Sequence, residues 1–138
     1  MSPAPAGYSG TPLVGKLGIK PGMGVLLVHA PVGYTHTLGA LPARLVWAQR
    51  ADHTVDLVQH FSQQRSELAT ALVDYRERLR SDAVLWVSWP KKASKLTTDI
   101  TEDTVRELAL PLGWVDVKVC AVDAVWSGLK LVVRKALR

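Results

Sequence analysis

The sequence has few of the features that mark secreted, membrane-spanning or disulfide-stabilised proteins. Its 138 residues include a single cysteine, Cys120, so no disulfide can form within the chain. The first residues, Met1–Gly7, lack the basic start and the apolar run of a secretory signal. The apolar runs have the length of a strand, far below the roughly 20 residues that cross a bilayer. We therefore expect a cytoplasmic protein with no membrane association and no need of an oxidising compartment.

The sequence also lacks the short motifs of common nucleotide, redox and zinc enzymes. No P-loop, Cys-x-x-Cys or His-Glu-x-x-His pattern occurs. The net charge is +5, and the basic residues are spread along the chain without a block or a stripe. This excess favours acidic partners such as phosphates or other anionic metabolites. Because there is neither a basic stripe nor an aromatic pattern of the RNP type, we expect only weak, salt-labile binding of nucleic acid.

What the chain does have is the composition of one globular domain. Hydrophobic residues make up 48% and charged residues 21%, and a chain of this length can bury a core without disulfides. Residues 1–12 are rich in proline, alanine, glycine and serine, which predicts a flexible lead-in. We expect residues 13–138 to form a single domain.

Short apolar runs predict a sheet with buried strands. Val25–Val28 and Ala83–Trp89 are nearly continuous apolar runs, Val55–Phe61 is a third candidate, and Arg44–Ala48 is a weaker one. The link Ala48–Thr54 is too short for a helical crossover, which needs about 10–12 residues. The sequence therefore leaves open whether the second strand is parallel, antiparallel or missing.

Helical periodicity separates and follows the later strands. An apolar residue recurs every three or four positions from about Gln63 to Arg80, which predicts an amphipathic helix. The apolar stripe of this helix consists of Leu68, Leu72, Tyr75 and Leu79. Asp99 followed by Glu102 fits a capping box, so we expect a second helix to start near Asp99 or Thr101.

The C-terminal region alternates between apolar and polar residues, as half-solvated strands do. This pattern predicts an antiparallel pair over about 114–122 and 129–135, with Trp126–Gly128 in the turn. Strands that alternate with helices favour a parallel sheet. The predicted class is therefore α/β, a three-layer Rossmann-like fold with a mostly parallel sheet closed by a C-terminal antiparallel hairpin.

From about Lys20 to Arg134 this order resembles the core of class I S-adenosylmethionine-dependent methyltransferases. Lys20–Leu26 is similar to the lead into their first strand, and Val55–Val58 and Val84–Ser88 resemble a later strand–helix–strand stretch. The resemblance implies a parallel sheet followed by an antiparallel hairpin.

The cofactor motif of that family is largely missing. Leu27 stands at the acidic position of the first strand, and His29 and Pro31 stand at the first two glycines of the loop. Only Gly33 matches the third glycine, and Trp47–Gln49 supplies no acidic residue for a ribose. Glycine lets the backbone approach the ligand, and proline removes an N–H donor. The resemblance therefore implies the fold, and we expect no bound cofactor.

The chain also resembles a family of small bacterial proteins of unknown function. The similarity lies in Ser9–Leu13, Leu85–Lys92, Asp116–Asp123 and Trp126–Lys130. These stretches are long and specific, and the resemblance implies no particular activity.

Ligands in open α/β sheets bind outside the carboxyl ends of the strands, and a basic segment follows the fourth predicted strand there. Lys91, Lys92, Ser94 and Lys95 lie between this strand and a helix N-terminus. Lysines and free helix N–H groups together form an anion site, and the alternative is a solvated basic turn. We expect Lys91, Lys92 and Lys95 to form a positive patch beside His29 and His60.

His29 and His60 follow neighbouring strands, so we expect them to face each other. They form an acid/base pair, part of a metal site, or two ordinary partly buried histidines. Because no third ligand is apparent, we predict no metal. Trp89 and Trp126 are candidates for flanking a planar ligand. The alternative for Trp126 and Ser127 is packing within a turn.

These observations predict a methyltransferase-like domain without the cofactor loop. We expect it to bind a small anionic ligand or a partner protein at the carboxyl ends of the strands. Two alternatives stay open: an enzyme with an altered S-adenosylmethionine or nucleotide site, and an RNA-binding accessory domain. The sequence does not decide whether the chain catalyses a reaction.

Overall fold

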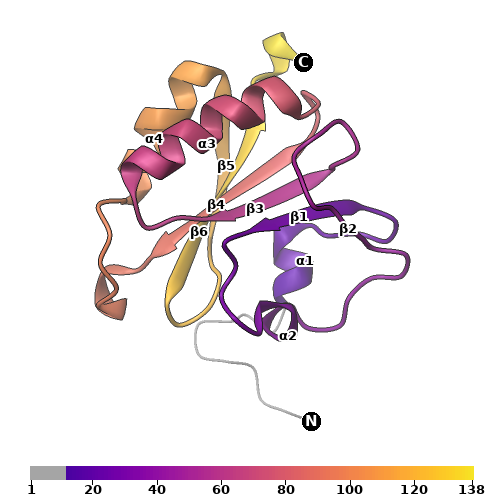
Figure 1. Ribbon diagram of the computed structural model, residues 1–138, viewed down its shortest axis with the longest axis horizontal. Helices are drawn as coiled ribbons and strands as arrows, with labels where there is room; N and C mark the ends of the chain where they lie inside the picture. Colours follow the sequence, from indigo (N-terminus) through magenta and orange to yellow (C-terminus); the bar gives the residue numbers. More distant parts are fainter. Residues whose placement is uncertain (1–11) are drawn as a thin grey trace.

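A computed structural model describes residues 12–138 (Figure 1). Its six strands form one sheet in the order β2-β1-β3-β4-β6-β5. The strands are β1 Gly24–Val28, β2 Val46–Trp47, β3 Leu57–Phe61, β4 Val84–Pro90, β5 Trp114–Ala121 and β6 Trp126–Val133. β1 pairs in parallel with β2 and β3, and β3 with β4, whereas β6 is antiparallel to both β4 and β5. The predicted fold class is confirmed, and the short second strand is parallel.

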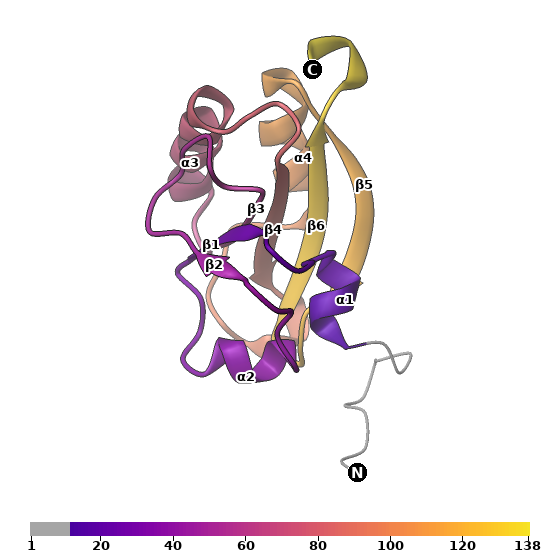
Figure 2. The same cartoon turned by 90° about the vertical axis from the view of Figure 1, so that its right-hand side faces the viewer.

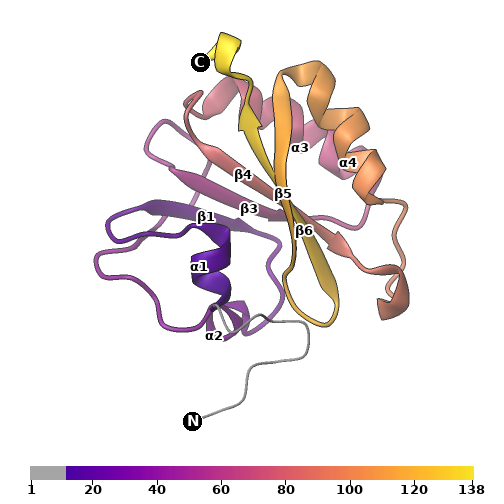
Figure 3. The same cartoon turned by 180° about the vertical axis from the view of Figure 1, so that it is seen from behind.

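Helices cover both faces of this sheet. They are α1 Leu13–Leu17, α2 Tyr34–Leu38, α3 Arg65–Arg78 and α4 Glu102–Ala109, with 3-10 turns η1 Lys92–Ser94, η2 Leu110–Leu112 and η3 Lys135–Leu137. α3 and α4 lie on one face, and α1 lies on the other with α2 beside it (Figures 2 and 3). The predicted flexible lead-in lies outside the described residues except for Pro12, whose carbonyl accepts the N–H groups of Gly15 and Lys16 at the start of α1.

The core has one apolar cluster on each face of the sheet. On the α3 and α4 face, the cluster includes three residues of the predicted stripe, Leu68, Leu72 and Tyr75. On the opposite face, side chains of α1 and α2 pack against Trp86 of β4, which is fully buried. No helix within the described residues is long and apolar enough to cross a membrane.

The predicted turn at Trp126–Gly128 is wrong, because these residues begin β6. The turn lies before them, where the Asp123 carboxylate accepts the N–H groups of Val125 and Trp126, each at 2.8 Å. Gly128 is needed inside the strand, since a Cβ there would lie 3.3 Å from the Trp86 ring. Alternating hydrophobicity locates two strands but does not say which residues between them turn.

The predicted capping box of Asp99 and Glu102 is also wrong. Thr101 caps α4 and exchanges hydrogen bonds with Thr104, whose hydroxyl accepts the Thr101 N–H at 3.0 Å. The Asp99 carboxylate instead accepts the N–H of Arg65, at the first turn of α3, at 2.6 Å. The segment between β4 and α4 is therefore fastened to the start of α3.

Asp56 gives the fold a measurable dependence on acid. Its carboxylate accepts the Gly24 N–H at 2.8 Å and an Arg80 N–H at 2.7 Å. Burial raises the pKa of Asp56, but the bonds from Gly24 and Arg80 outweigh this effect and hold the pKa below its ordinary value. The stabilisation is therefore present above about pH 4, the pKa of the unfolded chain, and is lost as the pH falls through the lower folded-state pKa.

We expect Asp56→Asn to reduce the free energy of unfolding by about 1 kcal/mol at pH 7, since the pair is partly exposed. At pH 3 the variant and the parent should differ less. Urea unfolding at both pH values measures this, with Asp82→Asn as the control, because Asp82 bonds the same arginine from an exposed position. A loss that is equal at both pH values would contradict the role of the Asp56 charge.

Candidate functional site

Two histidines meet at the carboxyl ends of neighbouring parallel strands. Val28 and His60 are opposite each other in the β1–β3 register, and His29 follows β1 directly. The imidazole centroids of His29 and His60 lie 5.4 Å apart with an angle of 65° between the rings. The His60 side chain is 1% exposed and that of His29 is 61% exposed. One ring is thus held inside the protein, and the other borders solvent.

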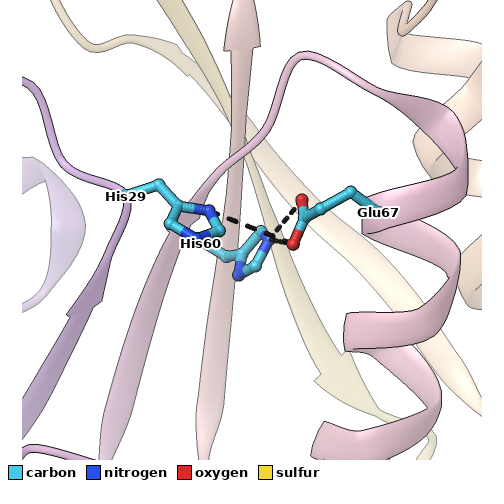
Figure 4. A group of neighbouring side chains, drawn as sticks. All are labelled: His29, His60 and Glu67. Carbon is cyan, nitrogen blue, oxygen red and sulfur yellow. Dashed lines mark hydrogen bonds and ion pairs between the residues drawn. The ribbon is translucent and has the colours of Figure 1, made fainter.

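A carboxylate from α3 joins the two rings (Figure 4). Nε2 of His60 lies 2.9 Å from Oε1 and 3.0 Å from Oε2 of Glu67. Nδ1 of His29 lies 3.9 Å from the same Oε2. Glu67 sits in the first turn of α3, where the helix dipole favours a negative charge. Ligand atoms of the three side chains all lie within 4.8 Å of one another.

Two hydroxyl groups make hydrogen bonds to the buried His60 and to Glu67. The Ser62 hydroxyl donates to Glu67 at 2.5 Å, and the Tyr75 hydroxyl lies 2.6 Å from Nδ1 of His60. Both nitrogens of the buried His60 ring therefore have partners, and both come from α3. Ring and carboxylate are held in one orientation.

Burial and hydrogen bonds set the charge of the cluster. Burial lowers the pKa of His60 in spite of the neighbouring Glu67 carboxylate. Burial acts to raise the pKa of Glu67, but hydrogen bonds from Ser62 and His60 outweigh it and lower that pKa. Burial, reinforced by the charge of Glu67, raises the pKa of Tyr75. At neutral pH the cluster therefore has a neutral imidazole at His60, an ionised Glu67 and a protonated Tyr75.

The cluster opens into a pocket of about 730 Å³ at the carboxyl ends of β1 and β3. The lining residues are His29, Pro31, Phe61, Ser62, Gln63, Gln64, Glu67, Thr97, Thr98, Asp99 and Trp126. This lining contains two carboxylates and no lysine or arginine. A pocket of this size fits a small molecule.

The lysine segment lies beside the pocket and not in its wall. Lys92 and Lys95 are exposed, and the residues after them, Thr97–Asp99, do line the pocket. The Lys91 amine donates to the carbonyl of Asp123 at 2.7 Å, and the Ser94 hydroxyl donates to the carbonyl of Lys91 at 2.7 Å. The structure thus brings His29 and His60 together and leaves the lysines outside the lining.

The two tryptophans do not form the expected pair. Trp89 packs in the cluster on the α3 and α4 face, whereas Trp126 packs in the cluster on the opposite face, with its ring 5.1 Å from that of Phe61. Trp126 lines the pocket and Trp89 does not, so they do not flank one ligand. Ser127 lies in β6 opposite Trp89, outside the lining.

His29 occupies an unusual backbone conformation. Its φ is +58°, in the left-handed region where glycine is favoured, and it stands at the first glycine position of the methyltransferase loop. A side chain costs about 1–2 kcal/mol there. Gly33, at the third position, also has a positive φ, +77°, and begins α2. Two residues of the segment after β1, His29 and Gly33, thus have the positive φ that glycine favours.

The sequence interpretation missed Glu67, which supplies the third potential ligand. Glu67 lies outside the apolar stripe predicted for this helix, but the helix follows the third strand after only Ser62–Gln64. So short a connection keeps the first helical turn at the end of its own strand. This spacing is the signal that could have indicated Glu67 as a partner for His60.

Comparison with known proteins gives a family and a fold. The family model "Protein of unknown function (DUF3052)" matches residues 40–135, which include the stretches Leu85–Lys92 and Asp116–Lys130. No curated protein matches the sequence. The predicted resemblance to a family of unknown function is therefore confirmed.

Solved structures of similar shape are methyltransferase-like. Fibrillarin from Methanococcus jannaschii is 12% identical, with a TM-score of 0.57 over 83% of this chain and 68% of that one. Fibrillarin from Aeropyrum pernix, a complex with natively bound S-adenosylmethionine, is 15% identical, with a TM-score of 0.56 over the same shares. A TehB-like S-adenosylmethionine-dependent methyltransferase from Corynebacterium glutamicum is 12% identical, with a TM-score of 0.50 over 83% of this chain and 82% of that one. At these identities the likeness establishes the fold alone.

Proposed function

This chain belongs to the DUF3052 family of proteins of unknown function, and we propose that it binds a small anionic ligand in the pocket at the carboxyl ends of β1 and β3. The observation that carries this proposal is the pocket itself, into which His29 and Glu67 project from different elements. Ligand sites of open α/β sheets lie at this edge. A concave site of this volume has room for a small molecule.

The lysine segment supports the anionic character of the ligand. The exposed Lys92 and Lys95 precede the wall residues Thr97–Asp99 by a few positions, and in this proposal their long side chains reach over the rim toward the ligand. Both carboxylates of the wall already accept hydrogen bonds, Asp99 from the backbone N–H of Arg65 and Glu67 from the Ser62 hydroxyl and His60.

The first-strand loop argues against S-adenosylmethionine as the ligand. The Aeropyrum pernix fibrillarin holds that cofactor on the same fold. In this chain Leu27 stands in place of the acidic residue, and Pro31 has no N–H to offer. His29 places an imidazole ring where the class I methyltransferases have a glycine, whose side chain is a hydrogen atom. We therefore expect a different ligand.

A thermal-shift screen tests the proposal. The compounds are S-adenosylmethionine, S-adenosylhomocysteine, nucleotides and phosphorylated metabolites. A ligand at about 100 times its Kd stabilises the folded state by about 2.7 kcal/mol, which raises the Tm of a domain of this size by roughly 5–10 °C. Thr97→Trp, which narrows the pocket from an exposed position, should abolish the shift. Micromolar binding of S-adenosylmethionine would instead favour an enzyme with an altered cofactor site.

Lys92 and Lys95 are expected to increase the affinity for an anionic ligand. Lys92→Ala together with Lys95→Ala should weaken an anionic ligand at least tenfold, because each charge-assisted contact is worth about 1.5–3 kcal/mol. Calorimetry measures the Kd. The matched control is Lys20→Ala with Lys135→Ala, which removes the same charge at the opposite end of the sheet, before β1 and after β6. An equal loss in both pairs would mean that only net charge matters. If the protein bound RNA at about 200 mM salt and bound none of the small anions, the proposal would be contradicted.

A further inference from the structure

We propose that His29, His60 and Glu67 bind a divalent transition-metal ion such as Zn²⁺, and that the ion presents an open coordination position to the pocket. Two imidazoles and one carboxylate are a donor set that proteins use for zinc and for non-haem iron with open positions. The three come from the end of β1, from β3 and from the first turn of α3, and they converge on one point (Figure 4).

The distances fit an ion with little rearrangement. Ligand atoms about 2.1 Å from a tetrahedral ion lie ~3.4 Å from one another. The His60–Glu67 separation of 2.9 Å is somewhat shorter than this, and the His29–Glu67 separation of 3.9 Å is somewhat longer. Because the His29 ring is largely exposed, it is free to move toward the buried His60 and the partly exposed Glu67 and close the remaining gap.

The buried ligands already have the outer partners that metal ligands need. A metal on Nε2 of His60 requires the proton on Nδ1, which then donates to the Tyr75 hydroxyl oxygen at 2.6 Å. The Ser62 hydroxyl holds one oxygen of Glu67 and leaves the other available. Such contacts hold the plane of the ring and the direction of the carboxylate, and the Tyr75 hydroxyl oxygen is able to accept the Nδ1 proton once a metal occupies Nε2.

The backbone of His29 is an independent observation. Its φ of +58° is a strained conformation, and its exposed ring gains little from burial. Strained residues that packing does not repay concentrate at functional sites. A ligand role gives a physical reason for a histidine at a position where glycine would be relaxed.

The ion would also supply positive charge to a pocket whose lining has none from lysine or arginine. A divalent cation with the Glu67 carboxylate leaves one positive unit at the ion itself, and the whole lining, which also contains the Asp99 carboxylate, becomes neutral instead of negative. Both changes favour an anionic group as the next ligand of the ion. This last step rests on the proposed function, whereas metal binding rests on the three side chains alone.

Calorimetry with the full chain, stripped by a chelator, tests the metal without any other ligand. We expect one Zn²⁺ per chain with a Kd in the micromolar range or tighter, and visible absorption bands with Co²⁺. His29→Gly should weaken Zn²⁺ at least tenfold while keeping or raising the Tm, because glycine relaxes the backbone. Glu67→Gln should weaken it similarly. The matched control His36→Gln removes an exposed histidine outside the cluster and should change nothing.

Azide added to the Co²⁺ form probes the open position and should change the visible spectrum. Folded His29→Gly and Glu67→Gln proteins that bind Zn²⁺ as tightly as the parent would overturn the metal site. A cobalt spectrum that azide leaves unchanged would overturn the open position. Small-ligand binding that a chelator leaves unchanged would refute the step in which the ion attracts the anionic ligand, and would leave both the metal site and the proposed function standing. Zn²⁺ binding by a protein for which the screen finds no small-molecule ligand would support the metal site and contradict the proposed function.

Discussion

Trp86→Ala is expected to cost about 3–5 kcal/mol of the free energy of unfolding, the range for a buried tryptophan truncated to alanine. Trp86 lies in β4 at the centre of the sheet and is fully buried against the α1 and α2 face. Its indole N–H donates to the carbonyl of Leu17, the last residue of α1, at 2.9 Å. The truncation therefore opens a cavity and also releases α1 from the sheet.

Trp86→Phe separates these two effects. Phenylalanine keeps most of the apolar volume but leaves the Leu17 carbonyl without its indole donor, which should cost about 1–3 kcal/mol. Urea unfolding followed by circular dichroism measures both variants. If Trp86→Ala cost no more than Trp86→Phe, packing on this face would contribute little, contrary to the complete burial of the ring.

The sequence was sufficient to predict most of the sheet. The apolar run Ala83–Trp89 could only be an interior strand, and β4 is indeed flanked by β3 and β6. The alternation after residue 114 predicted an antiparallel pair for the same physical reason, since one face of it borders solvent. These patterns reflect average burial, which depends on the residue types alone.

The site depends on contacts between particular side chains of different elements, and hydrophobic patterns carry no information about such contacts. Glu67 belongs to the polar residues of its helix, and nothing in the helical period distinguishes a solvated carboxylate from one that faces His60. Tyr75 counted as an apolar stripe residue, yet its hydroxyl makes the contact that orients the ring. Both roles require the position of α3 relative to the strand end.

The lysine segment failed to reach the pocket wall for a related reason. Residues between β4 and α4 have no periodicity, so their path was not predictable. That path is set by particular hydrogen bonds, from Lys91 to Asp123 and from the Arg65 backbone to Asp99. Only three-dimensional contacts decide which residues of such a segment face a ligand.

A buried polar network beside the site gives the second large expected effect. Gln59 of β3 is fully buried; its carbonyl accepts the Tyr34 hydroxyl at 2.6 Å, and its amide donates to the Ser88 hydroxyl at 3.2 Å. Leucine has a similar volume, so Gln59→Leu removes both hydrogen bonds with little cavity. Two buried hydroxyls each lose this partner, and we expect a loss of about 2–4 kcal/mol in urea unfolding.

A double-mutant cycle isolates the bond between Tyr34 and Gln59. Tyr34→Phe alone should cost about 1–2 kcal/mol, and adding it to Gln59→Leu should cost less than the sum, because the hydroxyl has already lost its acceptor. Tyr34 begins α2 directly after Gly33, so this bond also holds the end of the loop that starts at His29. Gln59→Leu should therefore weaken Zn²⁺ binding as well, although Gln59 contacts none of the three ligands through its side chain. Additive costs in the cycle would mean that the two side chains act separately, and the loop would then be held by packing of α2 alone.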